Sequence, residues 1–157
     1  MDMWKCLKEG RQLPIPDEDT LVFWEGCRRR RLLIQQCDDC HAFRFPPSPL
    51  CPQCSSSMAT WHQDSGRGEV LTFCVYHSDL AGPAWRSKLP YVVTVVELLQ
   101  SRVKMLGNLM VTDPDLVRIG LEVRLEFETI DNRITLPQFR PLSDCEGSRG
   151  LQSRSKR

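Results

Sequence analysis

Two Cys-x-x-Cys pairs, Cys37/Cys40 and Cys51/Cys54, constrain this sequence more than any other feature, and ten residues separate them. Each pair lets a tight turn direct two thiolates at one ion, and two such turns complete a tetrahedral set of four sulfurs. Because protein ligands fill all four positions, none is left for water or substrate. The spacing therefore predicts a structural zinc site that folds a domain and does no Lewis-acid chemistry.

Other interpretations of the four cysteines are weaker. No secretory segment precedes them, and disulfides are rare in the cytosol, so two disulfides are disfavoured. A redox pair would stand alone beside a βαβ unit. His41 follows Cys40 directly, but four well-spaced cysteines make it a non-ligand. The choice between zinc and iron stays open, because a tetrahedral set of four sulfurs suits both metals.

Composition excludes several classes of protein. The chain has 157 residues and a formal net charge of +1, so no bulk attraction to nucleic acid or to an anionic membrane is expected. No apolar run approaches the roughly 20 residues of a transmembrane helix, and the first residues lack an apolar signal core. We therefore expect a cytoplasmic protein without membrane association. The remaining cysteines are scattered, as reduced thiols would be: Cys6, Cys27, Cys74 and Cys145.

The chain is predicted to be mainly β and to have four parts. Residues 1–31 form an extended segment and a helix, and residues 32–62 a rubredoxin-like zinc ribbon. Residues 63–142 form a five-stranded OB-fold barrel. The Ser-, Gly-, Arg- and Lys-rich residues 143–157 form a disordered basic tail.

Charge patterns mark both ends of the predicted helix. Asp17–Thr20 should open it, because acidic and hydroxyl side chains cap helix N-termini. The run Arg28–Arg31 should close it, since the helix dipole favours cations there. We interpret the arginines as a solvated helix end; a site for an anionic ligand or an acidic partner surface is the alternative.

Alternating and β-branched segments predict the strands. Leu121–Ile130 alternates apolar with charged side chains, as a half-buried strand does. The ribbon strands are expected at 32–36 and 42–45, with 55–63 as a connector. The barrel strands are expected at 69–77, 91–99, 103–110, 121–130 and 134–139, with a turn-rich link at 113–120.

Several motifs together resemble a known family, the acyl-CoA-associated zinc-ribbon/OB-fold proteins, over about residues 14–141. The order of helix, four-cysteine ribbon and barrel is the same. The motifs that carry the resemblance are Phe23-Trp24-Glu25-Gly26, the four cysteines, Phe45-Pro46-Pro47, Ser65-Gly66-Arg67-Gly68-Glu69-Val70, Pro90-Tyr91-Val92-Val93 and Leu136-Pro137-Gln138-Phe139-Arg140-Pro141.

The resemblance implies a non-catalytic accessory subunit that binds structural Zn²⁺ and forms a hetero-oligomer with a thiolase-like catalytic subunit. Such complexes act on acyl-CoA thioesters by thiolysis, Claisen-type condensation or retro-aldol cleavage, so this would be one subunit of an acyltransferase or a retro-aldolase. The catalytic residues are then expected on the partner, with the accessory chain helping to bind CoA. Thiolysis of a 3-oxoacyl-CoA in aromatic or steroid degradation is expected, including the benzoylsuccinyl-CoA thiolase type.

The residues themselves predict no catalytic group. Cys74 and His77 are three apart in a strand, so they point to opposite faces and make a poor nucleophile–base pair. Cys74 is predicted to be a small buried hydrophobe, and His62 and His77 to lie at the surface. A self-sufficient CoA-binding enzyme is therefore disfavoured.

The loop between the first two barrel strands, residues 78–90, is longer than a hairpin requires. It carries Trp85, Arg86 and Lys88, an aromatic ring with two cations that suits the CoA arm or the rim of a partner. A mobile, solvated loop is the alternative.

Nucleic-acid binding is the rival function, because ribbons and OB barrels both occur in nucleic-acid-binding proteins. OB folds stack single-stranded bases on aromatics of the second and third strands, which here offer Tyr91 alone. Since the charge balance is also neutral, nucleic acid is the less favoured partner.

Overall fold

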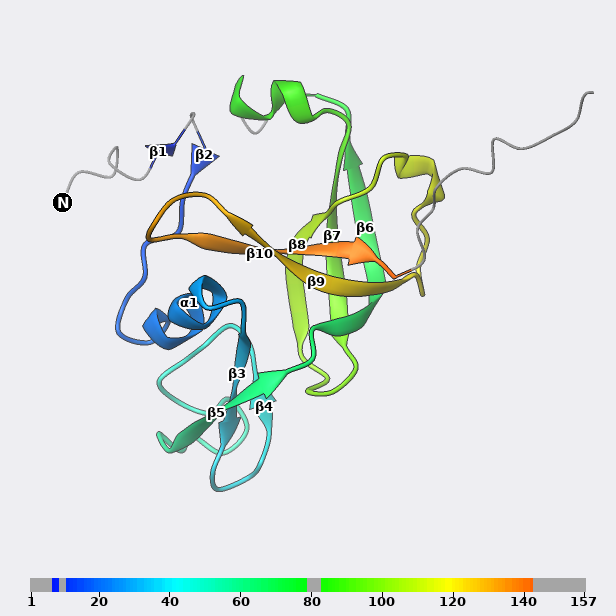
Figure 1. Cartoon of the computed structure of the whole chain (residues 1–157). Coiled ribbons are helices and arrows are strands. Elements are labelled where there is room, and N and C mark those ends of the chain that lie inside the picture. The colour runs from blue at the N-terminus through cyan, green and yellow to red at the C-terminus, as the bar shows by residue number, and fades with distance from the viewer. Residues whose placement is uncertain (1–6, 9–10, 79–82, 143–157) are drawn as a thin grey trace, which may run out of the picture.

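The computed structural model describes residues 7–8, 11–78 and 83–142 (Figure 1). The predicted tail at 143–157, and the cysteines Cys6 and Cys145, lie outside them. Within the described part are a short hairpin of β1 (Leu7–Lys8) and β2 (Arg11–Gln12), the helix α1 (Leu21–Arg28), a three-stranded sheet and a closed five-stranded barrel. The predicted fold class is confirmed.

The start of α1 differs in detail from the expected cap. Thr20 stands at the N-cap with a helical backbone and makes no side-chain cap bond. Its hydroxyl instead turns back and donates to Asp17 Oδ1 at 2.6 Å, and its N–H donates to the same oxygen at 2.9 Å. The Asp17 carbonyl then accepts from the Leu21 N–H at 2.8 Å. A turn closed by Asp17 therefore begins the helix.

The helix ends in a Schellman arrangement built without glycine at its usual place. Arg30 has a φ of 57°, and its N–H donates to the Cys27 carbonyl at 2.9 Å. The Arg31 N–H donates to the Gly26 carbonyl at 2.8 Å. Glycine is required at position 26, because a Cβ there would lie 2.8 Å from the Arg31 carbonyl oxygen and 2.9 Å from Leu33 Cγ. The chain thereby reverses tightly from the helix into the ribbon.

The ribbon sheet has the order β4-β3-β5, with β3 (Leu32–Cys37), β4 (Phe43–Arg44) and β5 (Ala59–Asp64). The prediction of a connector at 55–63 is wrong for its second half, because β5 pairs with β3 from Leu32↔Asp64 to Cys37↔Ala59. Its mixed sequence has no clear alternation, and pairing with the open edge of β3 overrides this weak propensity.

The helix packs on the ribbon through aromatic side chains. The ring of Phe23 lies 5.3 Å from that of Phe45 and 5.0 Å from that of Trp24. Two of the sequence motifs quoted above therefore meet at one contact. Cys27 is fully buried beside them, and burial raises the pKa of its thiol to about 12.

The barrel closes in the order β10-β8-β7-β6-β9, the strand order of an OB fold. Its alternation in β9 is as predicted, with Val123 buried and Glu122 and Arg124 exposed. One helical turn, η3 (Pro114–Leu116), lies in the predicted link. The strands are β6 (Arg67–Tyr76), β7 (Tyr91–Leu98), β8 (Lys104–Leu109), β9 (Glu122–Thr129) and β10 (Thr135–Pro141).

A β-bulge in β6 changes which side chains face the core. The register with β7 shifts between Val70 and Thr72, so Leu71 is the extra residue. Such a shift moves the following residues to the other face. Cys74 is consequently exposed, and its prediction as a buried hydrophobe is wrong. Cys27 and Cys74 take part in no disulfide within the described residues.

One hydrophobic cluster runs from α1 and the ribbon into the barrel, and includes Phe23, Ile34, Val96 and Phe139. The joint between the two units is a buried carboxylate. Asp64, the last residue of β5, accepts from the Gly66 N–H at 2.8 Å and from the Ser101 N–H at 3.1 Å. These bonds tie the end of the ribbon to the β7–β8 turn.

Candidate metal centre and loop site

The four predicted ligands converge on one point. The sulfurs of Cys37, Cys40, Cys51 and Cys54 all lie within 4.8 Å of one another. The Cys37–Cys54 pair is 3.5 Å apart and the Cys40–Cys51 pair 3.6 Å apart. A tetrahedral ion with metal–sulfur bonds of about 2.3 Å places its sulfurs roughly 3.8 Å apart. The two shortest pairs are close to this spacing, so the cluster suits a tetrahedral zinc or iron ion.

The two Cys-x-x-Cys turns, here called knuckles, have the same pattern of backbone hydrogen bonds. In the first, the Cys37 N–H donates to the Ala42 carbonyl at 3.0 Å and the His41 N–H to the Cys37 carbonyl at 3.0 Å. In the second, the Cys51 N–H donates to the Ser56 carbonyl and the Ser55 N–H to the Cys51 carbonyl, both at 2.8 Å. The sulfurs are thus presented by two equivalent turns.

A left-handed residue follows each knuckle. His41 has a φ of 61° and Ser55 a φ of 62°, the region that glycine adopts most easily. The His41 carbonyl accepts from Gln36 Nε2 at 2.9 Å. The metal-ligand cluster itself consists of the four cysteines, with His41 outside it.

Backbone amides favour the thiolate forms that a metal needs. The N–H groups of Gln53 and Cys54 lower the pKa of Cys51 to about 6. Those of Cys40 and Asp39 lower the pKa of Cys37. Cys37 and Cys51 are also the buried pair, whereas Cys54 is exposed. In the other half of the cluster, partial desolvation and the neighbouring thiols raise the pKa of Cys40, and the neighbouring thiols raise the pKa of Cys54 to about 12. The backbone thus favours the thiolate at one cysteine of each pair, Cys37 and Cys51.

The predicted loop site lies on a short helical segment, η2 (Pro83–Lys88). The half-buried Trp85 packs against Tyr91, with ring centroids 4.7 Å apart. Lys88 Nζ lies 5.8 Å above the Trp85 ring and 3.6 Å from Glu128 of β9. Arg86 is exposed. The structure thus brings Trp85 and Lys88 together and fixes both against the barrel.

One aromatic member of this site was missed by sequence reasoning. The ring of Tyr76 stacks on that of Tyr91 at 4.9 Å with an interplanar angle of 2°. Because Trp85 also packs on the Tyr91 ring, the three rings form a group on the outer face of the barrel, which we call the aromatic ladder. Tyr76 reaches this face because of the bulge at Leu71, which a sequence does not reveal.

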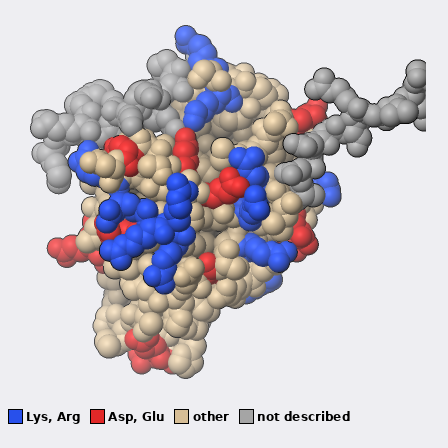
Figure 2. Space-filling view, viewed as in Figure 1, with Lys and Arg blue, Asp and Glu red and all other residues tan. Residues whose placement is uncertain are grey.

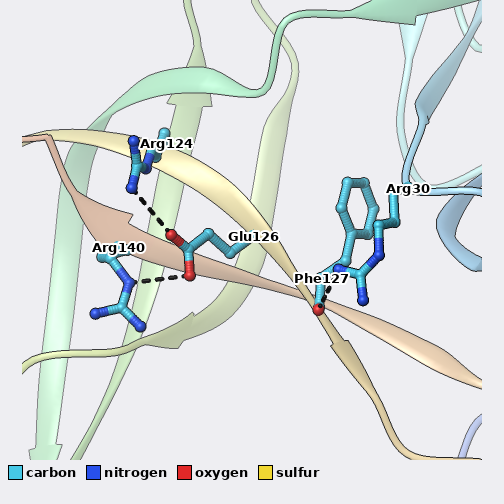
Figure 3. A network of polar contacts seen from close by, with 5 residues as sticks. All are labelled: Arg30, Arg124, Glu126, Phe127 and Arg140. Carbon is cyan, nitrogen blue, oxygen red and sulfur yellow. Dashed lines mark hydrogen bonds and ion pairs between the residues drawn. The ribbon is translucent and has the colours of Figure 1, made fainter.

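The arginine run is more ordered than the predicted solvated helix end. Arg30 crosses to the barrel, where its guanidinium donates to the Phe127 carbonyl at 3.1 Å (Figure 3). It also donates to Thr129 Oγ1 at 3.5 Å. Arg31 Nε donates to Gln63 Oε1 at 2.8 Å. Arg29, with its side chain 69% exposed, does behave as predicted.

Helix, ribbon and barrel together define a class of proteins with a structural four-cysteine ribbon joined to an OB fold. Two family models match the chain: the ChsH2 rubredoxin-like zinc ribbon domain at residues 24–59 and the ChsH2 C-terminal OB-fold domain at residues 61–128. A DUF35 domain-containing scaffold protein of Pyrococcus furiosus is 30% identical over 131 residues, 79% of this chain and 93% of that protein. The chain belongs to the ChsH2/DUF35 family.

Two longer relatives are subunits of hydratases. The probable enoyl-CoA hydratase alpha subunit of Thermomonospora curvata is 37% identical over 141 residues, 90% of this chain. The 3-oxo-4,17-pregnadiene-20-carboxyl-CoA hydratase alpha subunit of Mycobacterium tuberculosis is 37% identical over 114 residues, 73% of this chain. The chain spans 43% and 35% of these two proteins.

A solved structure provides an assembly for comparison. The structure described as the Ltp2-ChsH2(DUF35) aldolase matches with a TM-score of 0.74 and 36% identity, covering 82% of this chain and 98% of that one. The described part of the chain contains no helix with the length and hydropathy of a bilayer-spanning segment.

Proposed function

We propose that this chain is a non-catalytic accessory subunit of a thiolase-superfamily complex that acts on acyl-CoA thioesters. The observation that carries the proposal is the likeness, at 36% identity and over 98% of its length, to a chain solved in the Ltp2-ChsH2(DUF35) aldolase. In this proposal the nucleophile and base belong to the partner. The present chain supplies an interface and helps to hold the CoA arm without touching the reacting carbon.

Retro-aldol cleavage in steroid side-chain degradation is the reaction class that we favour. An aldolase complex and a pregnadiene-carboxyl-CoA hydratase subunit both stand among the relatives. Thiolysis of a 3-oxoacyl-CoA, including the benzoylsuccinyl-CoA type expected from the sequence, is the other possibility. The two reactions differ in one reactant, because thiolysis consumes free CoA and retro-aldol cleavage does not.

The experiment is co-expression with the thiolase-superfamily protein of the same genome that is most similar to Ltp2. We expect a stable hetero-oligomer that cleaves its acyl-CoA substrate, whereas this chain alone is inactive. Turnover should be independent of added CoA for the aldolase and dependent on it for the thiolase. Full turnover by either protein alone would contradict the accessory role.

The metal in this proposal is structural Zn²⁺. A tetrahedral iron–thiolate site would be coloured, whereas a zinc site is colourless because Zn²⁺ has a filled d shell. Elemental analysis of the purified chain with a visible absorption spectrum distinguishes the two. One equivalent of zinc without visible absorption is expected.

We also propose that Trp85, Arg86 and Lys88 contact the CoA arm or the partner. Support comes from the contacts that hold two of these side chains against the barrel, since Trp85 packs on Tyr91 and Lys88 pairs with Glu128. Trp85→Ala should raise the KM for the thioester or weaken assembly while the isolated chain stays folded. Lys104→Ala, an exposed change on β8, serves as the control.

Single-stranded nucleic-acid binding is the second candidate function. The aromatic ladder of Tyr76, Tyr91 and Trp85 favours it, because bases stack on such rings in OB folds. The net charge of +1 speaks against it. Fluorescence anisotropy with labelled single-stranded oligonucleotides tests this alternative. Tight binding that Tyr91→Ala abolishes, in a chain that assembles with no CoA enzyme, would favour it over the accessory role.

A further inference from the structure

Six arginines gather on one side of the molecule. Figure 2 shows Lys and Arg side chains concentrated over the end of α1 and over the β9–β10 hairpin. Figure 3 shows three of them, Arg30, Arg124 and Arg140, at this hairpin. We call the set the arginine face; its members are Arg28, Arg29, Arg30, Arg31, Arg124 and Arg140.

The arginine face has a large excess of positive charge. Among the described residues, two carboxylates pair with it. Glu25 bonds Arg28 at 2.7 Å and Arg29 at 3.6 Å. Glu126 pairs with two further members, Arg140 at 2.9 Å and Arg124 at 3.2 Å. Six positive and two negative side chains leave +4, while the whole chain carries +1, so the remainder must carry a net −3.

The neighbouring carboxylate on β9 does not remove this excess. Glu128 is next to Glu126 on the same side of the strand, but it pairs with Lys88 at 3.6 Å and accepts from Gln138 Nε2 at 2.8 Å. Its charge is therefore balanced by a cation outside the set.

Two of the arginines are held in place by neutral groups. Arg30 donates to the Phe127 carbonyl and to a threonine hydroxyl, and Arg31 donates to the Gln63 side-chain oxygen. Such bonds fix the position of each guanidinium without neutralising its charge. Because side-chain entropy is already lost in the free chain, less is lost when an anion binds. Arg30 is fixed in this way even though its backbone position is one that favours glycine.

The distribution of the guanidiniums indicates what kind of anion fits. A small phosphate ligand needs donors that converge on one point. Here the arginines are tied to separate acceptors along a helix end and two strands. An extended surface with several carboxylates is the complementary shape, and arginine is enriched at protein interfaces.

We propose that the arginine face docks on an acidic surface of the chain's catalytic partner, an inference that rests on the accessory-subunit function proposed above. Opposite charges on the two surfaces accelerate association more than they strengthen the final complex, and salt screens them. The docking should therefore depend on ionic strength mainly through its association rate.

The test reverses two charges that do not hold the fold. Arg29 and Arg124 are 69% and 55% exposed, so Arg29→Glu combined with Arg124→Glu changes the arginine face without removing the Arg30 or Arg31 bonds. Lys104→Glu combined with Arg118→Glu is the matched control, because it makes the same change of charge at exposed positions outside the arginine face. Circular dichroism checks that both variants are folded.

Binding of each full-length variant to the co-expressed partner named above is measured by surface plasmon resonance at low and high salt. At low salt we expect the arginine-face variant to bind about 10- to 100-fold more weakly, largely through a slower association rate, and the control within about threefold of the parent. At about 0.5 M salt the difference should shrink to a small factor.

Each other outcome has a distinct meaning. A parent chain that forms no complex with this partner overturns the proposed function and the inference with it. A complex that both variants form equally well overturns the inference and leaves the function standing. If the arginine-face variant docks normally but has a raised KM for the acyl-CoA, the arginine face binds the phosphates of CoA, and the proposal that it docks on the partner is wrong.

Discussion

The ribbon and the barrel are both β structures, but different forces hold them together. In the ribbon, β4 has two residues, and the buried side chains include the polar Gln35 and Arg44. Arg44 Nε donates to Gln35 Oε1 at 2.8 Å, while its Nη1 is buried without a hydrogen-bond partner in the described part of the chain. Part of the interior of this unit is polar, so we expect the four-sulfur cluster to contribute much of its stability.

The barrel is stabilised by burial spread over the whole sheet. Its five strands close on themselves, and each contributes inward side chains with almost no exposure, such as Val70, Val92, Val96 and Val123. No single residue dominates a core of this kind. The comparison teaches that damage to the ribbon should be local and nearly complete, whereas damage to the barrel should be global and graded.

Removing one thiolate should have the largest effect. Cys51→Ala leaves three sulfurs, and because structural zinc contributes on the order of 10 kcal/mol of folding free energy, we expect loss of the metal and unfolding of the ribbon. The barrel should stay folded. Elemental analysis gives the metal content, and amide hydrogen exchange compares β3 with β7.

The exposed Cys74 provides a matched control for the thiolate experiment, since it is a free cysteine outside the cluster. Cys74→Ala should keep the full metal content and the protection of β3. A Cys51→Ala chain that has lost its metal but still protects β3 would show that the ribbon is stable by packing, and the comparison above would be wrong.

A cavity in the barrel core should come next in size. Phe139 is 1% exposed, and its ring lies over Gly107, where a Cβ would be 3.0 Å from it. Phe139→Ala should lower the free energy of unfolding by about 3–5 kcal/mol in denaturant titrations. Leu106→Ala, at a side chain 70% exposed, should change it by less than about 0.5 kcal/mol. A large loss of bound metal in Phe139→Ala would mean that the two units are not independent.

Weakening the joint should have a smaller effect on both units. The two carboxylate oxygens of Asp64 each accept one backbone N–H, so Asp64→Asn would face one of these donors with an NH₂ group. We expect a loss of about 1–3 kcal/mol in the free energy of unfolding. The exposed Asp115→Asn is the control. Calorimetry measures the melting of the variant. Separate transitions for the ribbon and the barrel in Asp64→Asn would show that Asp64 couples the two units. An unchanged melting curve would show that Asp64 does not couple them.

Local patterns made most of the fold and the metal centre predictable. The cysteine spacing predicted the four-sulfur cluster, and alternation predicted the half-buried β9. What sequence reasoning missed depends on pairing between distant segments. The strand β5 exists because β3 has an open edge, and Tyr76 and Cys74 face outward because of one extra residue at Leu71. The contact of Arg30 with the barrel is not predictable from local sequence, because its acceptor, the Phe127 carbonyl, is 97 positions away.

The smallest expected effect concerns the two left-handed residues of the knuckles, and it has the opposite sign. His41 and Ser55 have φ values of 61° and 62°, which costs a residue with a Cβ about 1 kcal/mol relative to glycine. The Ser55 N–H bond to the Cys51 carbonyl at 2.8 Å is a backbone contact that glycine keeps. Ser55→Gly should therefore stabilise the ribbon by about 0.5–1 kcal/mol, the gain being reduced by the greater freedom of glycine in the unfolded chain.

The matched control is Asp39→Gly, at an exposed knuckle position outside the left-handed region, which should destabilise the ribbon by a similar amount. Metal-release kinetics with a chelator measure both, since release requires the ribbon to open. Slower release from Ser55→Gly and faster release from Asp39→Gly are expected, and equal acceleration in both would show that the knuckles are limited by sulfur–metal bonds and not by backbone conformation.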